Sequence, residues 1–316
     1  MSTPNGQMNL AQARVVDPVL STIALGYKLP QAVGETLFPR VPVNLRGGKV
    51  IQFGKEAFKK YNTVRAPGAA TARIQFGYEG VPYAIVPNSL EAPVPREIQQ
   101  DASIMPGVDS GTRAVNLVMR SNILSLEVEQ AAIARNAAGY DANHKVALAG
   151  TSQWSDYSGV SNPTKDVLAW REAIRSTTGQ YPNVMEIGAA VMAGLREHPK
   201  IVDRIKYTGR DSLTVEILQN LWEIPKIVVG TMVSADDAGN FSDVWGKDVV
   251  LGYVPPAPST NEEPSYGYTY VYNGHPLVES PYWEPQTKSW IYGVSFDRQT
   301  QLTGNLAGFL GQNVVA

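Results

Sequence analysis

The feature of this 316-residue sequence that most limits its fold is one long helical pattern in residues 109–140. Asp109 or Ser110 can cap its N-terminus, and Gly139 ends the run. Apolar residues recur inside it near helical spacing: Val115, Val118, Met119, Leu126, Ile133 and Ala137. At 1.5 Å per residue such a helix is on the order of 40 Å long. Because β-like segments lie on both sides of it, the pattern predicts a spine helix that spans the molecule.

Residues 1–38 are typical of an arm without a core of its own. Asp17 precedes Pro18, which matches an N-cap followed by proline at the first helical position, so Val19–Lys28 is expected to form a short helix. A second short helix is expected at Gln31–Thr36. Short helices joined by prolines bury little surface by themselves, so this arm is expected to lie on another surface.

Residues 39–100 are expected to be β structure. Val41–Val43 and Lys49–Phe53 flank Asn44–Gly48, whose Gly-Gly pair is typical of a hairpin turn. Val81–Val86 is a further strand pattern. Four prolines indicate edge strands and bends rather than a central ladder: Pro82, Pro87, Pro93 and Pro95.

Basic residues concentrate in the same region. From Arg40 to Arg73 there are eight basic residues and one acid, Glu56, which is a net charge of +7. Since the whole chain has a formal net charge of −2, the rest of it carries −9. A basic, glycine-containing loop on an otherwise acidic molecule is suited to contact an acidic neighbour. The candidate residues for such contacts between subunits are Arg46, Lys49, Lys55, Lys59, Lys60 and Arg65.

Two other interpretations of this basic segment stay open. A solvated loop would carry the same charges, and a nucleic-acid site would need them as well. The nucleic-acid interpretation is disfavoured because few aromatic residues lie among the basic ones, namely Phe58 and Tyr61, and no base-reading motif accompanies them.

Residues 146–285 alternate between helix and strand patterns. Asn162-Pro163 can cap and open a helix over Thr164–Thr178, and Gly179 stands at the expected C-terminal position. Further helices are expected at Gly188–Glu197 and Thr214–Trp222, and strands at Tyr181–Ile187, Lys226–Val229, Asp248–Val254 and Ser289–Phe296. The predicted fold class is α+β.

The segment Tyr266–Tyr272 contains four tyrosines in seven residues. Tyrosine combines an apolar ring with a polar hydroxyl and is enriched where protein surfaces meet. We therefore expect this segment to be an exposed or intersubunit β strand.

Residue types that carry catalysis or metal binding are scarce. The chain has no cysteines, which removes disulfides, thiolate nucleophiles and cysteine metal sites. Of the three histidines, His144, His198 and His275, none has metal-ligand spacing, and His198 is expected at a helix end. There is no Gly-x-Ser-x-Gly elbow and no Gly-rich nucleotide motif. The sequence therefore indicates no enzyme, no cofactor and no metal site.

The sequence also lacks membrane and export signals. Met1–Leu10 has no basic-then-apolar pattern, and no apolar run approaches the roughly 20 residues that span a bilayer. We expect a protein that is soluble until it assembles.

One stretch resembles a segment typical of the major capsid proteins of tailed, double-stranded DNA bacteriophages. It is Leu195–Tyr207, where a helix that ends at His198-Pro199 leads into an Asp-Arg-Ile-Lys strand. The similar order continues through Thr214–Leu218, Ile224–Gly230 and Val244–Leu251. The resemblance covers roughly residues 180–254.

This resemblance implies a Hong Kong 97-like capsid fold. The expected parts are an N-terminal arm in residues 1–38, an extended β-hairpin loop with peripheral-domain strands in 39–100, the spine helix of the peripheral domain in 101–145, an axial domain in 146–285, and a C-terminal strand that returns through the peripheral sheet in 286–316.

The same resemblance implies a structural protein that self-assembles, through hexameric and pentameric capsomers, into an icosahedral shell around the phage genome. A separate scaffolding protein is expected, because the arm is short. A portal protein and, as in some relatives, a decoration protein are further expected partners. Packaged DNA would be contacted without sequence specificity, and no membrane is involved. The expected location is the virion capsid, and the host cytoplasm during assembly.

Other functions stay open at this point. An encapsulin-type nanocompartment protein would have the same fold and would enclose enzymes. An unrelated enzyme and a surface adhesin are disfavoured by the missing catalytic residues and the missing signal peptide. In some shell proteins a loop lysine is covalently joined to an asparagine of a neighbour, for which Lys55, Lys59 or Lys60 and Asn305 would be the candidates here.

The capsid interpretation depends on one physical expectation. The arm and the lysine-rich loop should lack partners within their own chain until neighbouring subunits supply them. A single subunit in which both are folded against its own body would contradict that expectation.

Overall fold

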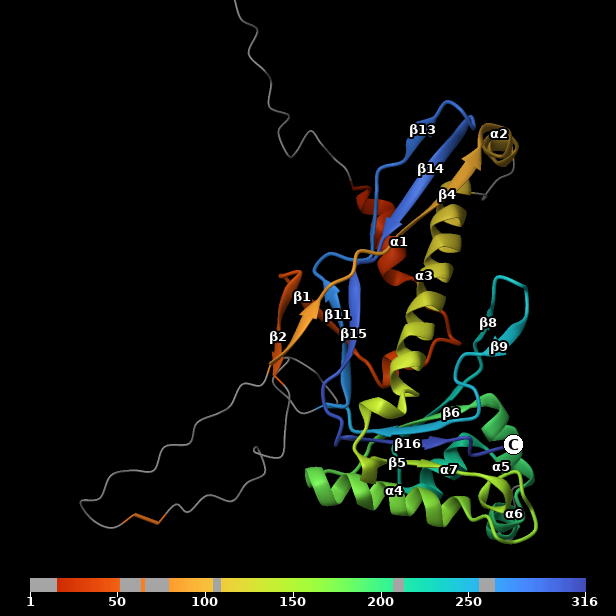
Figure 1. Cartoon of the computed structure of the whole chain (residues 1–316). Coiled ribbons are helices and arrows are strands. Elements are labelled where there is room, and N and C mark those ends of the chain that lie inside the picture. The colour runs from red at the N-terminus through yellow and green to blue at the C-terminus, as the bar shows by residue number, and fades with distance from the viewer. Residues whose placement is uncertain (1–15, 52–63, 66–79, 105–108, 207–212, 256–264) are drawn as a thin grey trace, which may run out of the picture.

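The computed structural model describes residues 16–51, 64–65, 80–104, 109–206, 213–255 and 265–316. Figure 1 shows a helix-covered sheet at one end of the molecule, and smaller sheets along the helix α3 (Ser110–Ala134), which runs from that sheet to the other end. Its 25 residues span about 37 Å at 1.5 Å per residue. The expected spine helix is confirmed, but it ends at Ala134, and Ala137–Gly139 forms a separate 3₁₀ turn capped by Asn136.

The helix-covered end contains a five-stranded sheet, called here the lower sheet. Its order is β5 (Lys145–Ala147), β16 (Gly308–Gln312), β10 (Val249–Gly252), β6 (Val184–Gly188) and β7 (Lys226–Gly230). The pairs β5–β16 and β6–β7 are parallel, and β10 is antiparallel to both of its neighbours. All four residues of β10 are buried, which is the pattern of a strand covered on both faces.

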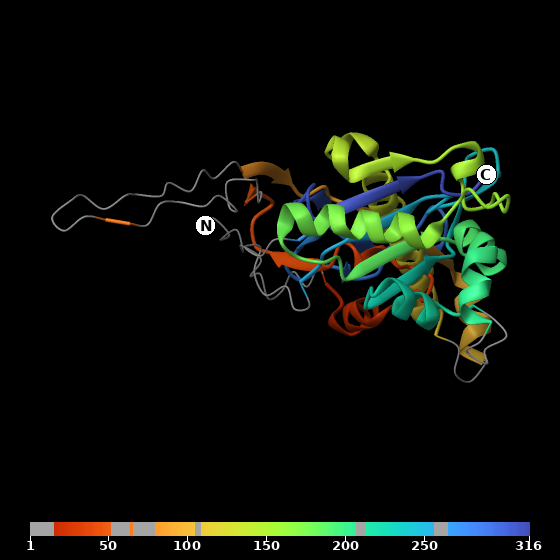
Figure 2. The same ribbon diagram turned by 90° about the horizontal axis from the view of Figure 1, so that it is seen from below.

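One face of the lower sheet is covered by helices, as Figures 1 and 2 show. They are α4 (Pro163–Thr178), α5 (Ala189–Glu197), α6 (Pro199–Ile205) and α7 (Val215–Trp222). Aromatic rings fill the space between the layers. Trp170 on α4 stacks on Trp154 and on Phe309 of β16, with ring centroids 5.5 and 5.3 Å away.

The bounds of α4 follow from its sequence. The Asn162 side chain accepts a hydrogen bond from the backbone N–H of Lys165, and Pro163 occupies the first turn. Gly179 ends the helix with φ of 72°, a conformation that glycine adopts without strain. The helices expected at Thr164–Thr178, Gly188–Glu197 and Thr214–Trp222 are therefore confirmed, each within one residue of its N-terminus.

The other face of the lower sheet packs against the C-terminal end of α3. The residues of this second core come from distant parts of the chain. They include Leu37, Phe38, Ala131, Tyr140, Trp245 and Tyr266. The spine helix thus ends in a core that it shares with the lower sheet.

Two further, smaller sheets of the described part, each of three or four strands, lie along the rest of the spine helix, one beside its middle and one at its far end (Figure 1). In one, β11 (Gly267–Tyr272) lies between β1 (Arg40–Val43) and β15 (Arg298–Leu302). In the other, β14 (Ser289–Ser295) pairs with β4 (Ser89–Pro95) on one side and with β12 (Leu277–Val278) and β13 (Tyr282–Glu284) on the other. The helix α2 (Arg96–Ile104) follows β4.

The edge positions expected from the prolines are confirmed at β4. This strand carries Pro93 and Pro95 and pairs only with β14 among the strands that the structure describes. Proline lacks the N–H that a second neighbour would need, so the strand is suited to an edge.

The N-terminal helix α1 (Pro18–Gly26) is confirmed, and so is its cap: the Asp17 carboxylate accepts hydrogen bonds from the N–H groups of Val19 and Leu20 at 2.9 and 3.0 Å. The second helix is one 3₁₀ turn, η1 (Gly34–Thr36). The expectation that residues 1–38 lack partners in their own chain is wrong for residues 16–38. Residues 1–15 lie outside the described part.

The physical reason is apolar burial. Ala24 of α1 packs in a core with α3, β4 and β14, and Leu37 and Phe38 are completely buried in the core at the end of α3. Burial of large apolar side chains stabilises this segment on its own subunit.

Three local expectations are wrong. Val41–Val43 and Lys49–Phe53 do not form a hairpin: β1 pairs in parallel with β11, and β2 (Gly47–Ile51) pairs with β3 (Gly80–Ala84). Val41 and Val43 share a core with the buried Tyr268 and Tyr270 of β11, and pairing with β2 through the short turn would not bury them in this way. Lys49–Phe53 extends beyond the described residues.

The segment Tyr266–Tyr272 is not exposed. Tyr266, Tyr268 and Tyr270 are at most 1% exposed: Tyr266 packs in the core at the end of α3, and the other two lie on β11, the central strand of its sheet. The Asp-Arg-Ile-Lys stretch is not a strand either. Its first three residues belong to α6 and Lys206 is the C-cap of that helix, whose first-turn Pro199 favours a new helix directly after α5.

The chain crosses between the two ends of the molecule more than once after the spine helix. The expected axial segment 146–285 includes β11, β12 and β13, which lie in the two smaller sheets. The C-terminal segment 286–316 supplies β14 and β15 to those sheets and β16 to the lower sheet. The boundary expected at residue 285 therefore does not separate one sheet from another, because β13 and β14 on its two sides pair with each other.

Candidate assembly surfaces

The described residues of the basic segment from Arg46 to Ile51, called here its root, contact other parts of the same subunit through Arg46 and through β3, the strand that pairs with β2. Tyr83 of β3 stacks on Tyr270 of β11, with ring centroids 5.0 Å apart. The guanidinium of Arg46 lies 2.7 Å from the Asp297 carboxylate and 4.7 Å above the Tyr272 ring. Arg46 therefore has charge partners within the chain, although its side chain is half exposed.

The other candidate contact residues are not brought together by the described structure. Lys49 is exposed on β2, and Arg65 is exposed as well. Lys55, Lys59 and Lys60 lie outside the described residues. Asn305, named as a partner for a covalent link, is exposed in the turn that precedes β16. The assignment of these residues to subunit contacts stays a prediction.

A second hairpin stands on the other flank of the spine helix. It consists of β8 (Val233–Ala235) and β9 (Phe241–Asp243), which pair with each other and with no further described strand. Phe241 is 77% exposed and Val233 is 47% exposed. Figure 1 shows this hairpin to the right of α3 and β2 to the left.

A buried carboxylate joins the N-terminal segment to the spine helix. Glu127 of α3 accepts hydrogen bonds from the N–H groups of Val33 and Gly34, each at 3.0 Å, and from the Trp245 indole at 2.7 Å. Burial raises the pKa of Glu127, while these hydrogen bonds lower it. Gly34 is required here, because a Cβ on it would lie 2.3 Å from the Gln130 side chain.

A second buried acid lies close by on the lower sheet. Glu186 of β6 is 1% exposed, and neither of its carboxyl oxygens has a hydrogen-bond partner in the described part of the chain. Burial, and secondly the charge of Glu127, raises the pKa of Glu186 well above its usual range. Burial without a hydrogen-bond partner disfavours the charged form of this carboxyl.

The sequence contains a signal for Glu127. Ile123, Ala131 and Ala134 lie one or two helical turns from it and are buried, so Glu127 falls on the apolar stripe of the spine helix. A charged residue on such a stripe requires a partner. Glu186 has a comparable place between Met185 and Ile187 in a strand that is buried throughout.

The end of the spine helix is fixed by an ion pair. Arg135 Nε lies 2.6 Å from the Asp248 carboxylate, and Arg135 Nη1 donates to the Val244 carbonyl at 3.0 Å. The other Asp248 oxygen accepts from the backbone N–H of Asn313 at 2.8 Å. The spine helix, the lower sheet and the C-terminal segment are thereby tied together.

The histidines have structural partners. Nδ1 of His144 is 2.9 Å from the Gly308 carbonyl, and His198 lies at the junction of α5 and α6, as predicted for a helix end. His198 Nε2 is 3.0 Å from Ser161 Oγ, but Ser161 also donates to the Asp156 carbonyl, and no carboxylate contacts His198 Nδ1 in the described structure. This pair lacks the orienting acid of a catalytic triad.

Further absences concern only the described residues. Among them there is no group of three or more His, Cys, Asp and Glu side chains that could hold a metal ion. Within the same residues, no helix is both long enough and apolar enough to cross a bilayer.

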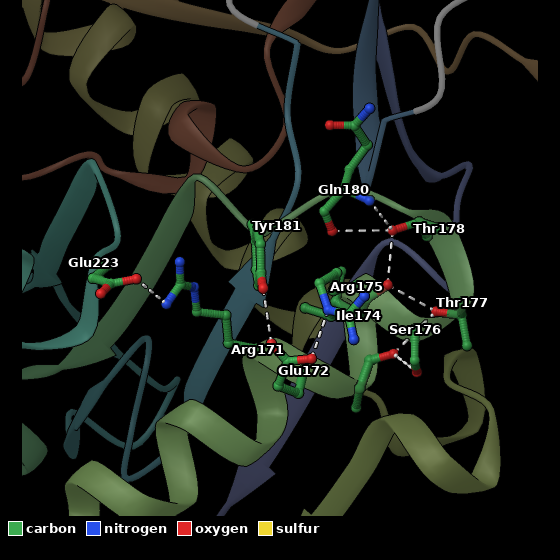
Figure 3. Close-up of polar contacts among 11 residues, drawn as sticks. Arg171, Glu172, Ile174, Arg175, Ser176, Thr177, Thr178, Gln180, Tyr181 and Glu223 are labelled. Atoms are coloured by element: carbon green, nitrogen blue, oxygen red, sulfur yellow. Dashed lines mark hydrogen bonds and ion pairs between the residues drawn. The ribbon is translucent and has the colours of Figure 1, made fainter.

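A surface network lies where α4 meets α7 (Figure 3). Arg171 pairs with Glu223 at 2.6 Å and lies 4.2 Å above the Tyr181 ring. Glu172 accepts hydrogen bonds from Arg175 at 2.6 Å and from the Tyr181 hydroxyl at 2.9 Å, which lower the pKa of its carboxyl. Exposed ion pairs of this kind add little stability, so the network orders the helix surface more than it strengthens the fold.

Comparisons with known proteins agree with this geometry. The family model described as phage major capsid protein E matches residues 137–266. The major capsid protein of Burkholderia phage BcepMu is 35% identical over 279 residues, which cover 86% of this chain and 88% of the relative. The major capsid protein of Pseudomonas phage JBD67 is 28% identical over 68% of each chain.

Solved structures extend the likeness. A phage-related protein from Bordetella bronchiseptica RB50 is 52% identical, with a TM-score of 0.83 over 96% of this chain and 98% of that chain. The satellite phage P4 procapsid and the SrpI encapsulin from Synechococcus elongatus each reach a TM-score of 0.51 at 11% identity, and thus share the fold alone.

These findings confirm the α+β, Hong Kong 97-like capsid fold and the absence of an enzymatic role, since the relatives are structural proteins. They also confirm assembly into oligomeric capsid shells and a place in the virion capsid. By sequence identity over most of its length, this chain belongs to the phage major capsid proteins.

Proposed function

We propose that this capsid protein forms an icosahedral shell around a double-stranded DNA genome, built from hexameric and pentameric capsomers. The observation that carries the proposal is its 35% identity to the BcepMu major capsid protein over 86% of this chain. The physical basis is a subunit with a rigid centre and exposed projections. Weak contacts that are repeated around a closed symmetry give a strong shell.

The regions of the subunit receive roles under this proposal. The spine helix and the two smaller sheets form the peripheral domain, and the lower sheet with its four helices forms the axial domain at the capsomer centre. Residues 1–15 and the basic segment reach neighbouring subunits, with Arg46, Lys49, Lys55, Lys59, Lys60 and Arg65 as contact residues. The charge difference between that segment and the rest of the chain supports this role.

Assembly is proposed to take place in the host cytoplasm with a separate scaffolding protein and a portal protein. A decoration protein on the outer surface is a further partner under this proposal. DNA is proposed to be enclosed without sequence-specific contacts, since the chain has a net charge of −2.

Electron microscopy of the purified protein, alone and with the scaffolding protein of the same phage, tests the proposal. Closed shells are expected in at least one condition. Monomers under all conditions would contradict it. Particles from phage-infected cells should contain nuclease-protected DNA, whereas particles that contain an enzyme instead would indicate the encapsulin alternative.

The basic segment can be tested in the same assay. Replacing Lys55, Lys59 and Lys60 by Glu, or deleting residues 1–15, should reduce shell formation while the subunit stays folded by circular dichroism. Deleting all of residues 1–38 is unsuitable, because it removes Leu37 and Phe38 from the core. Normal assembly of both variants would show that neither segment contacts neighbours.

A further inference from the structure

The β8–β9 hairpin presents an apolar face that its own subunit does not cover. In its register Val233 lies opposite Asp243, and Ala235 lies opposite Phe241, so these four side chains share one face. All four residues are exposed, Phe241 by 77%. An isolated two-stranded sheet is marginally stable in water, so a hairpin with this composition gains stability from a partner.

The turn of the hairpin is nevertheless well organised. One Asp236 carboxylate oxygen accepts hydrogen bonds from the N–H groups of Ala238 and Asn240 at 2.9 and 2.8 Å, and the other accepts from the Asn240 side chain at 3.0 Å. Gly239 has φ of 83°, which such a turn requires. The hairpin is therefore a preformed projection, and ordering it costs little when a partner binds.

The charge of the hairpin defines the chemistry of that partner. Between Gly230 and Gly246 there are three acids, Asp236, Asp237 and Asp243, and no basic residue. The segment Arg40–Arg73 has the opposite character, with a net charge of +7. This segment also contains apolar aromatic residues, Phe53 and Phe58, which suit an apolar face.

The two elements lie on opposite flanks of one subunit. Figure 1 shows β2, the described root of the basic segment, to the left of α3 and the β8–β9 hairpin to the right. Complementary surfaces on opposite flanks allow each copy to bind the next one head to tail. Such a contact closes into a ring when the rotation from one copy to the next divides a full turn into a whole number of steps.

We propose that the β8–β9 hairpin receives the part of the basic segment beyond β1, residues 49–73, of the adjacent copy within a capsomer. Phe241 and Val233 bind its apolar residues, and Asp237 and Asp243 lie next to its lysines. This inference rests on the proposed function, because it requires neighbouring copies in a ring. It adds the element that the basic segment contacts.

Disulfide trapping tests the proposed pairing, since the chain has no cysteines of its own. Asp237→Cys is combined in turn with Lys49→Cys, Lys55→Cys and Lys59→Cys, and assembled shells are oxidised and run on a denaturing gel without reductant. At least one pair should give a ladder that ends at five or six linked chains. Each single variant should stay monomeric, because a head-to-tail contact does not bring two copies of one residue together.

The outcomes separate the inference from the proposed function. Shells without a ladder for any pair, or a disulfide within one chain, would overturn the inference alone. A dimer from Asp237→Cys by itself would also overturn it, because that contact would be two-fold. If the cysteine-free parent formed no shells under any condition, the proposed function would fail and the inference with it.

Charge exchange provides an independent measurement. Asp237→Lys with Asp243→Lys should reduce shell yield by roughly tenfold or more. Adding Lys55→Glu and Lys59→Glu to the same chain should restore most of the yield. The matched control, Glu197→Lys with Asp203→Lys on α5 and α6, makes the same change of charge at exposed residues and should not be restored by those two substitutions. Absence of restoration for the hairpin pair would overturn the inference.

Discussion

Two strands of the lower sheet, β7 and β10, and the β8–β9 hairpin come from one continuous stretch of chain, yet the sheet and the hairpin differ in almost every physical respect. These two strands flank the hairpin in sequence. All four residues of β10 are buried, and β7 pairs with β6, which is buried throughout. Between them, every residue from Ala235 to Asp243 is exposed. The comparison indicates a division of roles, in which the sheet provides the free energy of folding and the hairpin keeps its apolar surface for contacts between copies.

The largest expected effect on stability is in the lower sheet. Trp170→Ala removes a ring that stacks on Trp154 and Phe309, and should lower the free energy of unfolding by about 3–5 kcal/mol. Urea unfolding of unassembled subunits measures it. Leu168→Ala, a more exposed residue on the same helix, is the control. Equal losses for both variants would contradict the assigned core.

A smaller loss is expected at the junction between the sheet and the spine helix. Glu127→Ala leaves the Trp245 indole and the N–H groups of Val33 and Gly34 without their acceptor, which should cost on the order of 2–4 kcal/mol. Arg120→Ala, an exposed residue on the same helix, should change stability by less than about 0.5 kcal/mol. Hydrogen exchange should be faster in residues 33–38 of the Glu127 variant, and unchanged exchange there would argue against the junction.

The buried acid of the lower sheet should respond to pH. The pKa of Glu186 is raised in the folded protein, so the folded state keeps its proton at pH values where the unfolded chain has lost it. Stability from this group is therefore complete below about pH 4.5 and falls as the pH rises toward the folded pKa. Glu186→Gln should raise stability by on the order of 1 kcal/mol near pH 7 and leave it unchanged near pH 4. The same gain at both pH values would show that ionisation is not the cause.

The smallest stability effect is expected at the hairpin, together with a large effect on assembly. Phe241→Ala should change the free energy of unfolding by less than about 0.5 kcal/mol, because the ring is 77% exposed. Its shell yield, counted by electron microscopy, should fall. Phe309→Ala is the matched comparison, since that buried phenylalanine should cost about 3–5 kcal/mol. A marked loss of stability in Phe241→Ala would remove the contrast between the two regions.

Local signals in the sequence were sufficient for α1 and α4, but not for α6, which was expected to be a strand, or for the end of α3. Asp17-Pro18 and Asn162-Pro163 place a capping side chain before a residue that lacks its N–H, and Gly179 supplies a left-handed end. Each of these signals depends on residues within one turn, so the bounds of these two helices could be predicted closely.

Non-local pairing limited the rest. The turn at Asn44–Gly48 indicates a hairpin, but β1 pairs with β11, more than 220 residues later in the chain. Burial of Tyr266–Tyr272 depends on the same pairing. The carboxylate of Glu127 finds its partners 93 and 118 residues away, on Gly34 and Trp245, and no spacing rule specifies them. The assignment of subunit contacts depends on charge alone and stays a prediction for Arg46, Lys49, Lys55, Lys59, Lys60 and Arg65.

The place of β16 in the lower sheet has a consequence for synthesis on the ribosome. This strand lies between β5 and β10 and is the last strand of the sheet to be translated. A nascent chain that stops before Gly308 lacks the strand that joins β5 to β10, β6 and β7, and its earlier strands keep unpaired edges. Prematurely terminated chains therefore cannot complete the subunit, and they are excluded from a structure in which every position must be filled by a finished copy.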